Sequence, residues 1–126
     1  MKPVNQLKDD DSFQACIASL LEMDIESVPH FDKPNDYKEW LNKRQLELVK
    51  IPIIFFDVNV KFHFIVTGRS PREEETTHSV ICYGDKLVHD PHYEKSGLPD
   101  AKYNVYVLAA HSPEKFMFNY LEFTNN

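Results

Sequence analysis

Residues 78–91, HSVICYGDKLVHDP, predict a β-hairpin that carries a histidine at one end and a carboxylate at the other. The two predicted strands, residues 79–83 and 86–90, are short, contain β-branched or aromatic side chains, and flank a Gly-Asp pair. His78 opens the first strand and Asp90 closes the second, twelve positions later. At neighbouring ends of a hairpin the two side chains can form a hydrogen bond that fixes the imidazole tautomer and stabilises its cation. This pair would supply two members of a nucleophilic triad.

The alternation of side chains along a strand restricts how this hairpin can turn. If Gly84 and Asp85 formed a regular two-residue turn, His78 and Asp90 would lie on opposite faces of the sheet. A three-residue loop of residues 83–85, or a bulge in one strand, brings them to the same face. We therefore predict one of these two irregularities.

Helices are predicted within residues 12–49, and strands are predicted within residues 51–123. Residues 12–23, SFQACIASLLEM, carry apolar side chains at helical spacing with Ser12 as a side-chain cap. A short turn at residues 24–28 and a second helix at residues 35–49 follow. Helices that precede strands favour an α+β fold, with helices packed on one side of an antiparallel sheet. The predicted strands are residues 51–58, 60–66, 79–83, 86–90, 103–109 and 116–123.

Composition predicts one soluble domain spanning residues 1–126. The chain is 42% hydrophobic and 13% aromatic, which is enough for a core of this size. Its net charge of −6 has the wrong sign for phosphate backbones or anionic lipid, so we expect no nucleic-acid partner. The longest apolar run, residues 51–56, is too short to span a bilayer, and no signal pattern opens the chain. We therefore expect no membrane partner and a cytoplasmic location. The chain has two cysteines, without the spacing of a zinc site, which fits a reducing compartment.

The third member of a triad is expected at a helix amino terminus, where backbone N–H groups stabilise a thiolate or an oxyanion. Cys16 has the better nucleophilic atom, but it lies about one turn inside the predicted helix, where a cysteine is usually a small core residue. Ser12 has the right position and a weaker nucleophile, and it is also an ordinary helix cap. Residue chemistry alone leaves both candidates open.

Two segments, NQLKDDDSFQACIASLL (residues 5–21) and HSVICYGDKLVHDP, resemble the papain-like cysteine peptidase superfamily, particularly the branch of bacteriocin-leader (double-glycine) peptidases. In that pattern a glutamine lies six positions before the catalytic cysteine, and a histidine that opens a strand is followed by an Asp-Pro pair. The resemblance implies a papain-like fold, with Gln6 in the oxyanion hole, Ser12 at the nucleophile position, His78 as general base and Asp90 as the orienting carboxylate. Cys16 matches a second, non-catalytic cysteine of the helix.

The resemblance implies a hydrolase of amide, isopeptide or thioester bonds that acts on a peptide or protein and needs no cofactor. This chain departs from the pattern at Ser12, because a hydroxyl is a far poorer nucleophile than a thiolate paired with imidazolium. Three explanations stand: an engineered inactivating Cys-to-Ser substitution, a natural recognition module that has lost catalysis, or a working nucleophile at Ser12 or Cys16. An acyltransferase using the same triad is a further alternative. The sequence does not predict an oligomeric state.

Two more features bear on the predicted chemistry. A metal site is the rival chemistry, because imidazole and carboxylate groups occur at His78, His89, Asp90 and His92. Alternation along the strand, however, sends His89 to the face opposite Asp90. The run of Asp9, Asp10 and Asp11 before the nucleophile position would oppose a thiolate, and it suggests selection of a cationic substrate segment.

Overall fold

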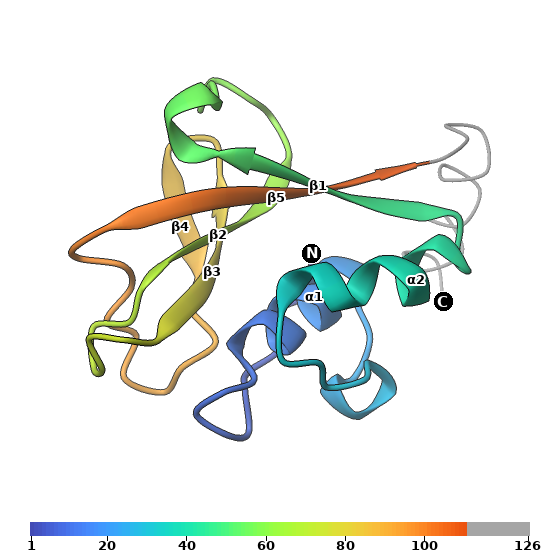
Figure 1. The fold of residues 1–126 in the computed structure, drawn as a ribbon, viewed down its shortest axis with the longest axis horizontal. Helices are drawn as coiled ribbons and strands as arrows, with labels where there is room; N and C mark the ends of the chain where they lie inside the picture. Colours follow the sequence, from blue (N-terminus) through green and yellow to red (C-terminus); the bar gives the residue numbers. More distant parts are fainter. Residues whose placement is uncertain (111–126) are drawn as a thin grey trace.

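The structure is a computed structural model, and it describes residues 1–110 of the chain. Two short α-helices, α1 (Ser12–Leu21) and α2 (Lys38–Asn42), lie on the same side of a five-stranded sheet (Figure 1). The sheet is antiparallel throughout and has the order β1-β5-β2-β3-β4. The predicted α+β arrangement is therefore confirmed. Its strands are β1 (Leu46–Pro52), β2 (His63–Arg69), β3 (Thr77–Tyr83), β4 (Lys86–His89) and β5 (Lys102–Ala110).

The helices cover one face of the sheet and build the larger of two apolar clusters. Ile17 and Ala18 of α1 are fully buried there, and Leu41 of α2 joins them. Ile65 and Ile81 contribute from β2 and β3. A smaller cluster on the other face consists of Phe64, Val66, Val80, Leu98 and Val105. The edge strands are β1 and β4, so the hairpin that carries the predicted dyad lies at one edge of the sheet.

Two predicted elements are wrong. The helix expected at residues 35–49 is a 3₁₀ turn, η2 (Pro34–Tyr37), followed by the single turn of α2, and the chain then enters β1. Gln45 has φ 61, a left-handed conformation that ends helical geometry, and β1 pairs with β5 along its whole length. The strand expected at residues 51–58 also fails, because β1 ends at Pro52 and a 3₁₀ turn, η3 (Ile53–Phe55), follows.

The remaining predictions differ from the structure mainly in their boundaries. The first helix ends at Leu21 rather than at Met23, because Glu22 is left-handed and its N–H bonds the carbonyl of Ser19. The turn at residues 24–28 is a 3₁₀ turn, η1 (Ile25–Ser27). The strand predicted at residues 116–123 lies outside the described residues. Among residues 1–110 no helix is long and apolar enough to cross a membrane.

Candidate functional site

The β3–β4 hairpin has the irregularity that the dyad requires. Its turn is the two-residue form, with Tyr83 opposite Lys86 and Gly84 at φ 62. The register then shifts so that Ile81 lies opposite His89, which marks a bulge in β4. The extra residue reverses the alternation of everything that follows it. The prediction of a bulge is confirmed, and the alternative of a three-residue loop is wrong.

The bulge brings His78 and Asp90 into direct contact. His78 Nε2 lies 2.7 Å from Asp90 Oδ1, and both side chains are only 2% exposed. An ionised carboxylate only accepts hydrogen bonds, so Nε2 carries the proton of this bond. The nitrogen left for proton transfer is therefore Nδ1, which makes no hydrogen bond within the described part of the chain. A buried imidazole oriented in this way has the arrangement of a general base.

The loop after β4 holds the Asp90 carboxylate in its charged form. Oδ1 also accepts the N–H of His92 at 3.0 Å, and Oδ2 accepts the N–H of Gly97 at 2.7 Å. Burial raises the pKa of Asp90, but the hydrogen bonds from His78, His92 and Gly97 outweigh it and lower the pKa from 3.8 to about 2. Asp90 is thus a permanent negative charge near neutral pH, suited to orienting His78 and to stabilising its cation.

Ser12 is the first residue of α1, and its side chain does not cap the helix. The N-cap residue is Asp11, so the predicted capping role of Ser12 is wrong. Its Oγ instead accepts the backbone N–H of Ser79 at 3.1 Å. This N–H is available because β4 ends at His89, opposite Ile81, so the ladder stops short of Ser79. The start of the helix thereby docks on β3 one residue away from His78.

The structure brings Ser12 next to the backbone of His78 without joining their side chains. No hydrogen bond links Ser12 Oγ to the His78 ring among residues 1–110. The Ser79 N–H uses a lone pair of Oγ and leaves the hydroxyl proton free to be donated. Ser12 is 6% exposed and His78 is 1% exposed, so this proton and the imidazole are both largely shielded from water.

Gln6 approaches the dyad through its main chain. Its N–H donates to the carbonyl of Pro91 at 3.0 Å, immediately after Asp90. Its side-chain Nε2 donates to the carbonyl of Lys8 at 2.7 Å, which leaves one of the two amide protons unused. The other amide atom, Oε1, is buried without a partner. Gln6 therefore belongs to the same region as the dyad, and its amide has one donor to spare.

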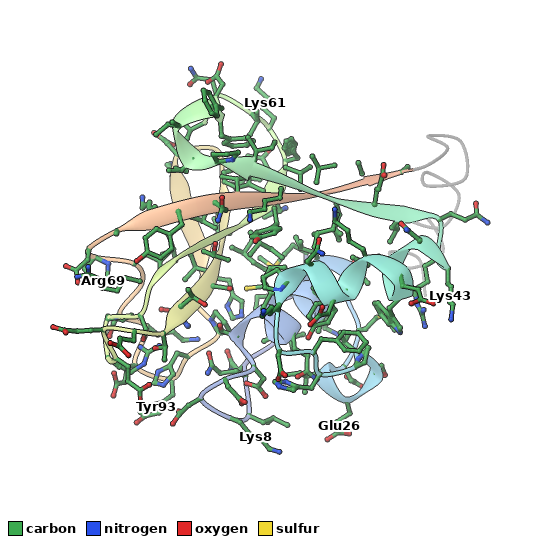
Figure 2. The ribbon with its side chains drawn as sticks, in the orientation of Figure 1. Lys8, Glu26, Lys43, Lys61, Arg69 and Tyr93 are labelled. Atoms are coloured by element: carbon green, nitrogen blue, oxygen red, sulfur yellow. The ribbon has the colours of Figure 1, made fainter. Side chains whose placement is uncertain are left out.

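Asp11 is a structural residue that the sequence analysis assigned differently. It is 5% exposed, and its carboxylate accepts the N–H groups of Leu7 and Lys8 at 3.1–3.2 Å. It shapes the loop between Gln6 and α1, and of the three aspartates in this run Asp9 and Asp10 are exposed. Asp11 occupies the N-cap position of α1 but makes no side-chain cap hydrogen bond, so the preference for aspartate at N-caps would not have predicted this role. In Figure 2, Lys8 of this loop and Tyr93 of the loop after β4 both lie at the lower edge of the molecule.

Cys16 is a core residue, as predicted. It is fully buried, and burial raises the pKa of its thiol well above the usual range, with the charge of Asp90 adding to the effect. A thiol of this kind does not supply a thiolate near neutral pH. The structure therefore does not fit Cys16 as a nucleophile.

The other histidines near the dyad have structural contacts. His89 Nε2 bonds the carbonyl of Val4 at 2.8 Å, on the face opposite Asp90, as alternation predicts. His92 Nδ1 accepts the N–H of Glu94 at 3.0 Å, and its ring lies 6.2 Å from that of His78. Within residues 1–110 no group of three or more histidine, cysteine or acidic side chains is arranged to hold a metal ion.

A cavity of about 830 Å³ lies away from the dyad. Its lining includes His63 at the start of β2 and Tyr83 at the end of β3, whereas His78 lies near the start of β3. None of the four predicted site residues lines it. The candidate site is thus defined by hydrogen bonds at the sheet edge rather than by this cavity.

Comparisons with protein-family models, with curated proteins and with solved structures give no match to this chain.

Proposed function

We propose that this chain is a papain-like cysteine-hydrolase scaffold with serine at the nucleophile position. The observation that carries the proposal is the buried 2.7 Å bond between His78 Nε2 and Asp90, beside a helix start that carries Ser12. The Asp90 carboxylate also accepts two backbone N–H groups, so the oxygen that faces His78 is fixed in place. This arrangement fixes one nitrogen of the imidazole and leaves the other free, which is what a general base requires.

The chemistry follows from these positions. A thiolate at position 12 would attack a carbonyl carbon, and His78 would give its proton to the leaving amine, alcohol or thiol. The developing oxyanion would accept hydrogen bonds from the N–H at the start of α1 and from the unused proton of Gln6 Nε2. Water, activated by His78, would then hydrolyse the acyl intermediate and restore the site. The Ser79 N–H, 3.1 Å from Ser12 Oγ, would add a hydrogen bond to an anion at this position.

The substrate we propose is a peptide or protein with an amide, isopeptide or thioester bond. With Ser12 in place we expect this reaction to be very slow, because the hydroxyl of serine remains protonated near neutral pH. A substitution that replaced cysteine fits this picture, since the base and its carboxylate are intact. An acyltransferase differs only in that an amine rather than water attacks the acyl intermediate.

A second candidate is a recognition module that binds a peptide or protein without cleaving it. The observation that favours it is that Ser12 Oγ bonds the Ser79 N–H and not the imidazole of His78. In this role Ser12 joins α1 to β3, and the dyad stabilises the edge of the sheet.

The two candidates differ in what a thiol at position 12 would do. We propose to combine Ser12→Cys with Cys82→Ser, because Cys82 is a half-buried free cysteine that would react in the background. The hydrolase predicts rapid alkylation by iodoacetamide at position 12 and hydrolysis of an activated ester. The matched control adds His78→Gln, which removes the base. The hydrolase proposal fails if alkylation is no faster than for a simple thiol, or is unchanged by His78→Gln.

A further inference from the structure

Lys95 lies in the loop after β4 in a backbone conformation that suits glycine better than lysine. Its φ is 56, in the left-handed region. Gly97, two residues later, also has a positive φ of 68, a conformation that glycine adopts without steric cost. A lysine at position 95 thus carries a conformational cost that a glycine would not.

The side chain of Lys95 joins two segments that are remote in sequence. Its Nζ donates to the carbonyl of Asp90 at 2.5 Å and to Asn5 Oδ1 at 3.1 Å. Asn5 directly precedes Gln6, and the Gln6 N–H donates to the carbonyl of Pro91. Two adjacent residues of the amino-terminal segment are therefore held at the end of the hairpin that carries Asp90, one by a charged side chain and one by a main-chain bond.

From this geometry we propose that Lys95 is a positioning residue, whose ammonium holds the segment that carries Gln6 against the Asp90–Pro91 end of the hairpin. The inference rests on the proposed function, in which Gln6 Nε2 binds the oxyanion. The ammonium contacts the carbonyl of Asp90 and not its carboxylate, which already has three N–H donors. Removing it should therefore disturb Gln6 more than the dyad.

The first test does not depend on catalysis and uses the native chain. Amide hydrogen exchange of the Gln6 N–H is compared between the chain and its Lys95→Gly variant, which removes the ammonium and also the backbone strain. We expect exchange about tenfold faster or more, because a charge-assisted hydrogen bond is lost. Lys95→Arg should restore much of the protection. Unchanged exchange in Lys95→Gly would overturn the proposal.

The second test separates the oxyanion hole from the dyad, in the Ser12→Cys, Cys82→Ser background. Acylation by p-nitrophenyl acetate passes through an oxyanion, whereas alkylation by iodoacetamide forms none. We expect Lys95→Gly to slow acylation about tenfold and to leave the alkylation rate within twofold. Asn5→Ala should give the same pattern, and the double variant little further loss, because both changes remove the Lys95–Asn5 hydrogen bond.

The outcomes of the second test distinguish the two proposals. If alkylation falls together with acylation, Lys95 acts through Asp90 and the inference about Gln6 is wrong. If no variant with a thiol at position 12 is acylated, the proposed function fails, and the hydrogen-exchange result still decides whether Lys95 holds the segment.

Discussion

The Asp90 carboxylate should contribute a measurable and pH-dependent share of stability. Its pKa falls from 3.8 to about 2 in the folded chain, a difference that corresponds to about 2 kcal/mol in favour of the folded state. Because the folded pKa is the lower one, this contribution is complete above the unfolded pKa of 3.8. It is lost as the pH falls toward 2, where the folded carboxyl also takes up its proton.

The perturbation that tests this is Asp90→Asn, which imitates the neutral carboxyl in size and shape. We expect the free energy of unfolding at pH 7 to fall by about 2 kcal/mol. The difference between the two proteins should shrink to about 1 kcal/mol at pH 3 and nearly disappear by about pH 2. Urea unfolding followed by circular dichroism at several pH values gives this difference directly. Other carboxylates titrate in both proteins, so their effects cancel.

Asp100→Asn is the matched control. Asp100 is exposed and lies 4.0 Å from Arg69 in a surface ion pair, so its loss should change stability by less than about 0.5 kcal/mol at every pH. A gap between the native chain and Asp90→Asn that stays constant from pH 6 to pH 3 would refute the reasoning. So would an Asp90→Asn variant as stable at pH 7 as the native chain.

Three further predictions concern the helix start, the cysteines and the sheet. Ser12→Ala should lower the free energy of unfolding by about 1–3 kcal/mol, because the buried Ser79 N–H loses its acceptor; Ser12→Thr, which keeps a hydroxyl, is the comparison. In the Cys82→Ser variant, Cys16 should react with Ellman's reagent only after urea unfolding, and a reaction under native conditions would show that it is not core. Gly68→Ala should lower the free energy of unfolding by about 3 kcal/mol or more, or prevent folding, because its Cβ would lie 2.1 Å from the backbone oxygen of Ala101. Thermal unfolding measures this, and an unchanged melting temperature would contradict it.

Local patterns were sufficient to predict the dyad. His78 and Asp90 lie within one hairpin, so the rule that side chains alternate along a strand constrained their relation without any knowledge of the rest of the chain. That rule alone required a three-residue loop or a bulge, and the register of β3 against β4 shows the bulge. The resemblance added Ser12 and Gln6, whose main-chain and side-chain contacts do reach the neighbourhood of the dyad.

Long-range strand pairing explains why residues 46–49 form a strand and not the end of the predicted helix. Residues 45–49 satisfy a helical spacing of apolar residues, but Leu46 and Leu48 also alternate as in a strand. The decision between the two depends on β5, where Leu46 lies opposite Ala110. A partner more than sixty positions away is not visible in a window of local periodicity, and the cost of closing such a loop is met only when the whole sheet forms.

The same limit applies to the role of Ser12. A serine before an apolar helix predicts a cap, because capping is a local interaction. The structure gives the cap position to Asp11 and sends the serine hydroxyl to Ser79, 67 residues away. That exchange is possible only because β4 stops at His89 and leaves one N–H of β3 without a strand partner. The unpaired N–H that anchors a hydroxyl here would equally stabilise an anion, so the contact that holds α1 to the sheet is also the one that would favour a thiolate at position 12.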